Sequence, residues 1–238
     1  MNNNIELYKG DCLEIINDIF KNIDNKKIIF VSDPPFNVNY HYNTYKDNKK
    51  EEDYLQMLFN IFGNNKSVII HYPEQLYKIS FKFNKIPLKI ISWVYNSNTG
   101  KQHRDIAFFD IVPDMKKIRQ PYKNLNDKRI KERISKGYEG AKLYDWWNIN
   151  QVKNVSKEKT KHPCQMPLEV MKNIIGILPY DAIIIDPFMG SGTTGLAVIE
   201  MNKIQNKNRK FIGIEQDNEY YNIAYNRIKE KEKEDNVV

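Results

Sequence analysis

Apolar and polar positions follow two rhythms along the chain. Apolar runs of about four to eight residues, typical of buried strands, are separated by longer segments with the helical spacing of apolar residues. The apolar runs lie at residues 26–33, 66–72, 88–95, 107–112, 182–186 and 210–215. The helical patterns cover residues 13–23, 51–62, 167–178, 193–202 and 218–233. Strands alternating with helices predict an α/β fold with a mostly parallel sheet and helices on both faces.

Residues 114–161 break this rhythm. The segment is polar, basic and aromatic, and no buried strand is evident before the stretch AKLYDWW. We therefore predict an insertion on the sheet rather than a second domain that folds independently.

Charge is concentrated in the same segment. The chain of 238 residues has a net charge of +7. Residues 114–161 contain 14 lysines and arginines against 6 aspartates and glutamates, whereas the remainder is nearly balanced. An AT-rich genome explains abundant lysine, but it does not explain this clustering. A local basic surface suits a polyanion such as nucleic acid, and an ordinary solvated face is the alternative.

Cysteine content and hydropathy exclude several other classes. Cys12 and Cys164 are too few for a disulfide framework and fit no metal-ligand spacing, which predicts a reducing cytoplasm and no metal site. No apolar run is long enough to cross a bilayer, and the first residues show no features of a signal peptide. We therefore expect no membrane partner.

A glycine-rich turn follows the apolar run at 182–186. Gly190, Gly192 and Gly195 match the G-x-G-x-x-G spacing of a dinucleotide-binding turn. Glu215 lies 20 positions after the last glycine, where an acid that binds a ribose is expected. A nicotinamide-dependent dehydrogenase is one interpretation. The position of this unit leaves little room for a substrate domain, so other residues must identify the ligand.

A second turn, Asp33-Pro34-Pro35-Phe36, follows the apolar residues 28–31. Two prolines stiffen the backbone and remove two N–H donors, which leaves carbonyl acceptors. One rigid turn then offers a carboxylate, a carbonyl and an aromatic ring. This set suits an exocyclic amine on a planar heterocycle. A proline-rich turn with a core phenylalanine is the structural alternative.

Together the two turns resemble motifs of the S-adenosylmethionine-dependent DNA amino-methyltransferases. Residues 33–36 match that family's catalytic Asp-Pro-Pro-(Tyr/Phe), and residues 186–194 match its cofactor loop. Residues 161–175 resemble the segment before the cofactor loop in the β class, which has the same order of motifs. The resemblance implies a Rossmann-like methyltransferase fold. Its three parts would be a catalytic half at 1–113, a target-recognition insertion at 114–161 and a cofactor-binding half at 162–238.

The resemblance also implies a site for S-adenosylmethionine. Asp186 would face the amino group of the cofactor, and Ser191 and Thr193 would receive its carboxylate at a helix N-terminus. Glu215 would bind the ribose hydroxyls. Asp11 would receive the adenine amine and is equally a candidate helix N-cap. The predicted cofactor residues are Asp11, Cys12, Asp33, His162, Asp186, Phe188, Gly190, Ser191, Gly192, Thr193, Glu215 and Gln216.

The implied reaction is methylation of a DNA base that has left the duplex. Hydrogen bonds from the amine to Asp33 and to the Pro34 carbonyl would direct its lone pair at the sulfonium methyl group. Phe36 would stack on the flipped base, and Pro35 completes the predicted catalytic set. An aspartate in the first motif position resembles adenine-N6 enzymes, whereas cytosine-N4 enzymes usually have serine. The alternatives are a cytosine-N4 enzyme, a methyltransferase of RNA or of a protein amide, and a non-catalytic DNA-binding module.

The tripeptide Pro163-Cys164-Gln165 matches the nucleophile segment of cytosine-C5 methyltransferases. Those enzymes carry their cofactor loop near the N-terminus and need a Glu-Asn-Val element that this sequence lacks. We therefore expect Cys164 to be structural, and His162 to order the turn or line the cofactor pocket.

The insertion supplies the candidates for DNA contact. Basic side chains there would bind phosphates or reach guanine edges, and Tyr122 would stack or act as a wedge where a base leaves the helix. Trp146 and Trp147 are expected to anchor the insertion to the core. The predicted DNA-binding residues are Arg119, Tyr122, Lys123, Arg129, Lys131 and Arg133.

The partner expected from the resemblance is double-stranded DNA. A homodimer and a cognate restriction endonuclease are two further partners that it suggests, with the chain acting either in restriction-modification or as an orphan enzyme.

Overall fold

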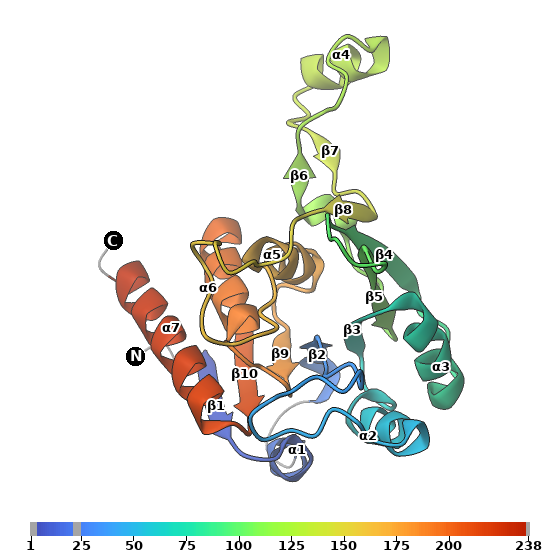
Figure 1. The fold of residues 1–238 in the computed structure, drawn as a ribbon. Helices are drawn as coiled ribbons and strands as arrows, with labels where there is room; N and C mark the ends of the chain where they lie inside the picture. The colour runs from blue at the N-terminus through green and yellow to red at the C-terminus, as the bar shows by residue number, and fades with distance from the viewer. Residues whose placement is uncertain (1–3, 21–24, 237–238) are drawn as a thin grey trace.

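An eight-stranded sheet forms the centre of the computed structural model, which describes residues 4–20 and 25–236 (Figure 1). Its order is β1 (Ile5–Lys9), β10 (Lys210–Glu215), β9 (Ile183–Asp186), β2 (Ile28–Ser32), β3 (Ser67–His71), β5 (His103–Phe109), β4 (Lys89–Val94) and β8 (Trp146–Asn148). The first five of these strands pair in parallel. β5 runs antiparallel to both of its neighbours, and β8 is parallel to β4. The prediction of a mostly parallel α/β sheet is confirmed.

Helices cover both faces of the sheet, with one apolar core on each side. One core contains side chains of α1 (Cys12–Phe20), α2 (Glu51–Phe62) and α3 (Pro73–Phe83). The other contains side chains of α5 (Leu168–Ile177), α6 (Thr193–Gln205) and α7 (Asn218–Asn236). Successive side chains of a strand point to opposite faces. Accordingly, Ile29 and Val31 of β2 enter the second core, and Ile28 and Phe30 enter the first.

Several elements differ from the predicted pattern. β1 and α3 were not expected, and β5 begins at His103 and ends at Phe109 rather than covering 107–112. A short 3₁₀ turn, η1 (Asn25–Lys27), precedes β2. The helix predicted at 13–23 is present as α1 up to Phe20, and residues 21–23 lie outside the described residues. Within residues 4–20 and 25–236, no helix is long and apolar enough to cross a membrane.

About half of the predicted insertion projects away from the sheet (Figure 1). We call residues 119–142 the arm. It consists of two short antiparallel strands with a helix at the tip, preceded by a 3₁₀ turn. These elements are η2 (Met115–Lys117), β6 (Arg119–Gln120), α4 (Lys128–Ser135) and β7 (Ala141–Lys142). The division of the chain at 113/114 and 161/162 stays a prediction.

The chain returns from the arm to the sheet through β8. Trp147 is buried, and its indole Nε1 donates to the Tyr144 carbonyl at 2.9 Å. Trp147 therefore anchors this segment as predicted. For Trp146 that prediction is wrong: its side chain is 46% exposed, and Lys123 Nζ lies 4.3 Å from its ring. Alternation along the strand explains the difference, because neighbouring residues of β8 face opposite sides of the sheet.

Candidate active site

The two predicted turns leave neighbouring strands at the same edge of the sheet. β2 and β9 pair in parallel, with Phe30 opposite Ile185, so Asp33, directly after β2, and Asp186, the last residue of β9, lie at the ends of adjacent strands. The Ser32 hydroxyl donates to Asp186 Oδ1 at 2.8 Å and links the two strand ends directly. This position matches the general rule that ligands bind beyond the carboxyl ends of parallel strands.

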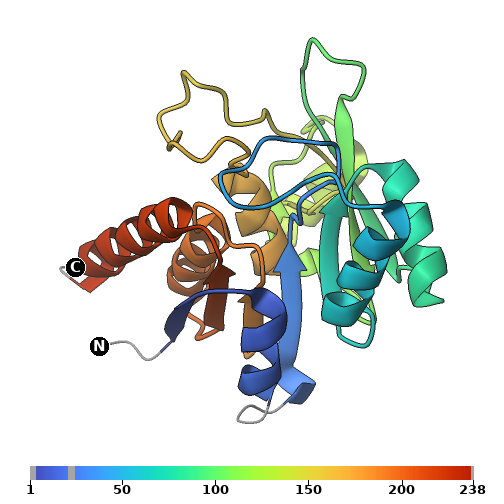
Figure 2. The ribbon, with the colours of Figure 1, turned by 60° about the horizontal axis from the view of Figure 1, so that its bottom comes forward.

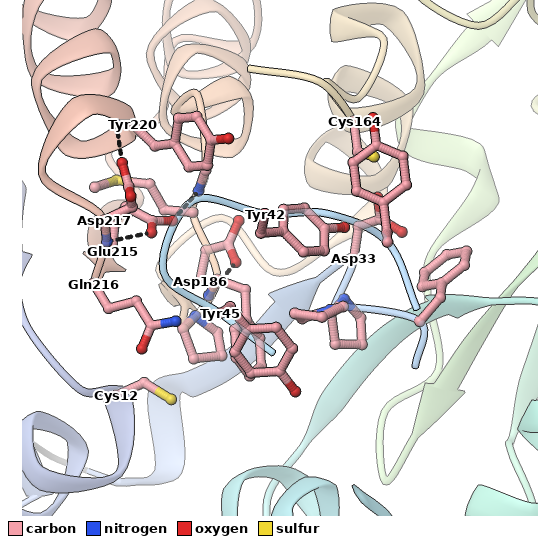
Figure 3. A pocket seen from close by; sticks show the side chains of 18 of the residues that line it. Cys12, Asp33, Tyr42, Tyr45, Cys164, Asp186, Glu215, Gln216, Asp217 and Tyr220 are labelled. Carbon is pink, nitrogen blue, oxygen red and sulfur yellow. Dashed lines mark hydrogen bonds between the residues drawn. The ribbon is translucent and has the colours of Figure 1, made fainter. Parts of the chain in front are cut away.

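A cavity of about 920 Å³ lies between these turns. Its volume is near the upper end of ligand pockets, which span roughly 300–1,000 Å³. Figure 3 shows Asp33 and Cys164 on one side of this space and Glu215 on the other. The lining includes fourteen predicted residues, namely Asp11, Cys12, Asp33, Pro34, Pro35, Phe36, His162, Asp186, Phe188, Gly190, Ser191, Thr193, Glu215 and Gln216.

Two glycines of the cofactor loop have different surroundings. Both have positive φ, +52° at Gly190 and +78° at Gly192, which favours glycine. A Cβ on Gly190 would lie 2.9 Å from His162 Nε2, beside the cavity. A Cβ on Gly192 would instead lie 2.9 Å from the Ala224 Cβ of α7, and Gly192 is outside the cavity lining. Gly192 therefore allows α6 and α7 to approach closely.

Asp33 has a largely buried carboxylate, one oxygen of which has no hydrogen-bond donor. Its Oδ2 lies 3.6 Å from Arg104 Nη1, whereas no described residue donates a hydrogen bond to its buried Oδ1. Burial raises the pKa of Asp33 to about 6, Arg104 opposes this rise, and Asp186 adds to it. A buried acceptor without a donor is costly, so Oδ1 is suited to a hydrogen atom from a ligand.

A chain of hydrogen bonds from β3 and α2 holds the proline turn. The Tyr72 amide donates to His71 Nδ1 at 2.8 Å, and the Tyr54 hydroxyl donates to the Pro35 carbonyl at 2.7 Å. His71 Nε2 lies 3.0 Å from that hydroxyl. Burial, assisted by the positive charge of Arg104, lowers the pKa of His71 to about 3. Because the neutral ring accepts at Nδ1, its Nε2–H donates to Tyr54.

These hydrogen bonds leave one carbonyl of the proline turn without a donor. Pro35 already accepts from Tyr54, whereas no described residue donates to the Pro34 carbonyl. Asp33 Oδ1 and the Pro34 carbonyl are therefore two acceptors without donors on the same rigid turn, beside the cavity.

Phe36 is enclosed by other side chains. Its ring stacks on His71 with centroids 4.1 Å apart and an angle of 21°, and Arg104 Cζ lies 4.7 Å over the ring. The edge of the Tyr72 ring also contacts it, at 5.0 Å between centroids. Stacking of a base on Phe36 requires one of these neighbours to move, so that role stays a prediction.

The other end of the cavity has carboxylates organised by backbone amides. Glu215 accepts from the Gly190 amide at 3.0 Å and from the Asp217 amide at 2.8 Å. Asp186 accepts from the Phe188 amide at 3.1 Å and from the Thr194 hydroxyl. Burial raises the pKa of Asp186 to about 6 and raises that of Glu215 above its ordinary value. Such carboxylates suit a ligand with cationic groups and vicinal hydroxyls, and S-adenosylmethionine has both.

Asp11 has the capping geometry considered above. Its Oδ1 accepts from the Leu13 amide at 2.7 Å at the start of α1, and the residue also lines the cavity. Both predicted roles of Asp11 are thus compatible with its position.

A tyrosine-bearing loop, residues 37–49, lines the cavity and was not recognised in the sequence. Asp47 is buried and accepts from the amides of Asn37, Val38 and Tyr40 at 2.7–3.0 Å, which fixes the shape of the loop. The loop crosses above the strand ends (Figure 2), and its Tyr40, Tyr42 and Tyr45 line the cavity. The stretch NYHYNTY directly after the catalytic motif was the available signal.

Neither cysteine in the cavity is activated. Burial raises the pKa of Cys12 to about 12, with Asp11 adding to the rise. Burial also raises the pKa of Cys164, whose thiol interacts with the hydroxyls of Tyr42 and Tyr40. A protonated thiol is a poor nucleophile, which agrees with a structural role for Cys164.

The predicted DNA-binding residues all lie on the arm, outside the cavity lining. Five are exposed and Tyr122 is half-buried. Asp127 caps α4 and also pairs with Arg129 at 3.3 Å, and Arg133 Nε donates to the Tyr122 hydroxyl at 3.3 Å. The arm thus presents cationic groups to solvent, and their contact with DNA stays a prediction.

Comparisons with known proteins identify the family. The model of a family described as DNA methylase, of the N6/N4 type, matches residues 28–226. The Type II methyltransferase M.BglII of Bacillus subtilis is 27% identical, over 97% of this chain and 71% of its own length. The DNA adenine methyltransferase YhdJ of Escherichia coli is 26% identical, over 84% and 75%. The solved M1.HpyAVI–SAM complex is 27% identical with a TM-score of 0.57, over 94% of this chain and 99% of its own.

Proposed function

The chain belongs to the N6/N4-type DNA methylase family, and from this premise we propose that it transfers a methyl group from S-adenosylmethionine to the N6 amine of an adenine in double-stranded DNA. Recognition of the family from its two turns is confirmed, as is the choice of S-adenosylmethionine over a nicotinamide cofactor. The dehydrogenase alternative raised by the glycine turn, which the resemblance to methyltransferases already disfavoured, is thereby excluded.

One observation carries the proposal. The turn after β2 and the turn after β9 line the same cavity, and the first presents two acceptors without donors, Asp33 Oδ1 and the Pro34 carbonyl. An exocyclic amine has two hydrogens to donate, so this pair of acceptors is matched to it. S-adenosylmethionine, when bound, supplies an electrophilic methyl group on a sulfonium.

The residues of the chain then have distinct tasks. Three parts of the cavity would hold the cofactor, namely Glu215, Asp186 and the start of α6. Asp33 and Pro34 would orient the amine so that its lone pair is directed away from the base plane. The Asp33 carboxylate would stabilise the positive charge that develops on nitrogen, and the proton leaves the nitrogen afterwards.

Adenine is preferred over cytosine because the motif begins with aspartate, as in the adenine-N6 enzymes it resembles. The relative YhdJ, which is named a DNA adenine methyltransferase, supports the same choice. A cytosine-N4 enzyme, a methyltransferase of RNA or protein amides and a non-catalytic module remain the rival hypotheses.

Methyl transfer by the purified chain tests the proposal. Duplex DNA incubated with methyl-labelled S-adenosylmethionine should yield N6-methyladenine on nucleoside analysis, and Asp33→Ala should lower the rate by at least about a thousandfold while cofactor affinity persists. N4-methylcytosine as the product would favour the cytosine rival. Equal transfer when RNA or protein replaces duplex DNA would contradict the proposed substrate, and full turnover by Asp33→Ala would contradict the proposed role.

Other features of the cellular setting stay predictions. These are a cognate restriction endonuclease, a homodimer, a cytoplasmic location, and base flipping during recognition. Modification mapping of DNA from cells that express the chain would give the methylated site and its sequence context together.

A further inference from the structure

Arg104 reaches the catalytic edge because β5 runs against the other strands. Asp105 of β5 pairs with His71, the last residue of β3. The beginning of β5 therefore lies where the parallel strands end, and Arg104 lines the cavity beside Asp33. Arg104 belongs to none of the motifs recognised in the sequence.

The Arg104 guanidinium is largely buried, and its Nη1 lies 3.8 Å from the weak acceptor Met166 Sδ. Its side chain is only 15% exposed, and its Nε has no hydrogen-bond partner in the described part of the chain. Aromatic rings surround it, with Cζ 4.7 Å from Phe36 and 5.3 Å from Trp93. The single carboxylate within 4 Å among the described residues is Asp33. Placing a charge in such surroundings is costly unless it is paired.

We propose that Arg104 is a positioning residue for methyl transfer, which fixes one oxygen of Asp33 by ion pairing and thereby keeps the carboxylate charged with its other oxygen directed at the target amine. This inference rests on the proposed function. The geometry supports it because Oδ2 faces Arg104 while Oδ1 has no donor. The same guanidinium covers Phe36 and so holds the ring against His71.

The charges around Asp33 determine the direction of the expected pH effect. Asp186 from β9 raises the pKa of Asp33, Arg104 from β5 lowers it, and burial is the largest influence. Tyr42 of the 37–49 loop and Cys164 also lie within electrostatic range, and both are neutral near pH 7 because burial raises their pKa. Tyr54 of α2 and Tyr95 after β4 are likewise neutral, for the same reason.

Removal of Arg104 should therefore shift the pH profile in one direction. Asp33 acts as an anion, so activity is lost as the pH falls through its pKa, which is about 6 with Arg104 present. Without the neighbouring positive charge the carboxylate protonates more readily, and the acid limb moves upward by about one to three pH units. A rate reduced near pH 7 should recover at higher pH.

The experiment measures single-turnover methyl transfer to duplex DNA across pH, for wild type, Arg104→Gln, Arg104→Met and Arg104→Lys. Methionine keeps apolar packing against Phe36 and Trp93 without charge, whereas lysine keeps the charge. We expect the acid limb to move upward in both neutral variants and to stay within about half a unit for lysine. Cofactor affinity, measured by calorimetry, should stay within about twofold and shows that each variant is folded.

Lys89→Gln is the matched control, because it removes a half-buried cation from the neighbouring strand β4, where Lys89 pairs with Asp145 rather than with Asp33. Its acid limb should not move. The inference is overturned if both neutral variants are slowed equally at every pH, or if either folded neutral variant keeps the wild-type limb. A wild-type chain that transfers no methyl group would instead refute the proposed function, so the two failures are distinguishable.

Discussion

The cavity and the arm use side chains in opposite ways. Around the cavity, several carboxylates are at least partly buried and held by specific donors, as with Glu215 between two backbone amides, and Asp33 Oδ1 is left without a donor. On the arm, cations lie in solvent, and their contacts are exposed, such as the pairs of Arg129 with Asp127 and of Arg133 with the Tyr122 hydroxyl. Buried networks fix geometry strongly, whereas exposed ion pairs contribute little. The cavity therefore depends on a fixed arrangement of side chains, whereas the arm contributes mainly positive charge.

Two glycines with positive φ, one in the cavity and one on the arm, allow a direct test of this difference. Gly190→Ala and Gly137→Ala incur a similar backbone cost of about 1–2 kcal/mol, since φ is +52° and +81°. The new Cβ meets the His162 ring in the first case and nothing within 4 Å in the second. Calorimetry should show S-adenosylmethionine affinity reduced at least about tenfold for Gly190→Ala and unchanged for Gly137→Ala. Equal losses of S-adenosylmethionine affinity in the two variants would contradict a specific role for the Gly190 backbone in the cavity.

Charge removal on the arm should have an intermediate effect, confined to DNA. Lys131→Gln combined with Arg133→Gln should weaken duplex binding roughly tenfold and lower the slope of log affinity against log salt by about two. Binding isotherms at several salt concentrations measure both quantities. Cofactor affinity should not change. An unchanged salt slope would place the DNA-binding surface elsewhere.

The smallest expected effect concerns the hydroxyl of Tyr122. Tyr122→Phe removes the acceptor for Arg133 Nε but keeps the ring, and exposed polar contacts are weak. We expect less than about threefold change in duplex affinity, in a competition assay against wild type. A loss above tenfold would show that the hydroxyl itself contacts DNA and that the arm is more specifically built than its exposure indicates.

Local patterns were sufficient for the parts of the site that follow strands. The turns after 28–31 and 183–185 were recognisable because a buried strand precedes each and unusual residues follow it. Their meeting in one cavity follows from parallel pairing of β2 with β9. The apolar pattern did not predict α3, because exposed Tyr77 and Phe81 obscure the apolar face of this helix. It did not predict β1 either, because β1 is a short edge strand.

Contacts between distant segments could not be predicted from the sequence. Arg104 has no local signal, since its importance comes from the antiparallel direction of β5. The neutral His71 and its link through Tyr54 to Pro35 likewise depend on tertiary packing. The pattern suggested Trp146 and Trp147 as equivalent, and only the register of β8 against β4 separates them.

The reversed direction of β5 makes position 104 a suitable site for engineering. Loops that carry catalytic groups can lose their geometry when they are lengthened, but position 104 lies within main-chain pairing to β4, where Trp93 is its partner. Its backbone location is thus insensitive to changes in the hairpin that precedes it. A change of charge at this one position should alter the pH dependence of methyl transfer, while the surrounding sheet keeps its structure.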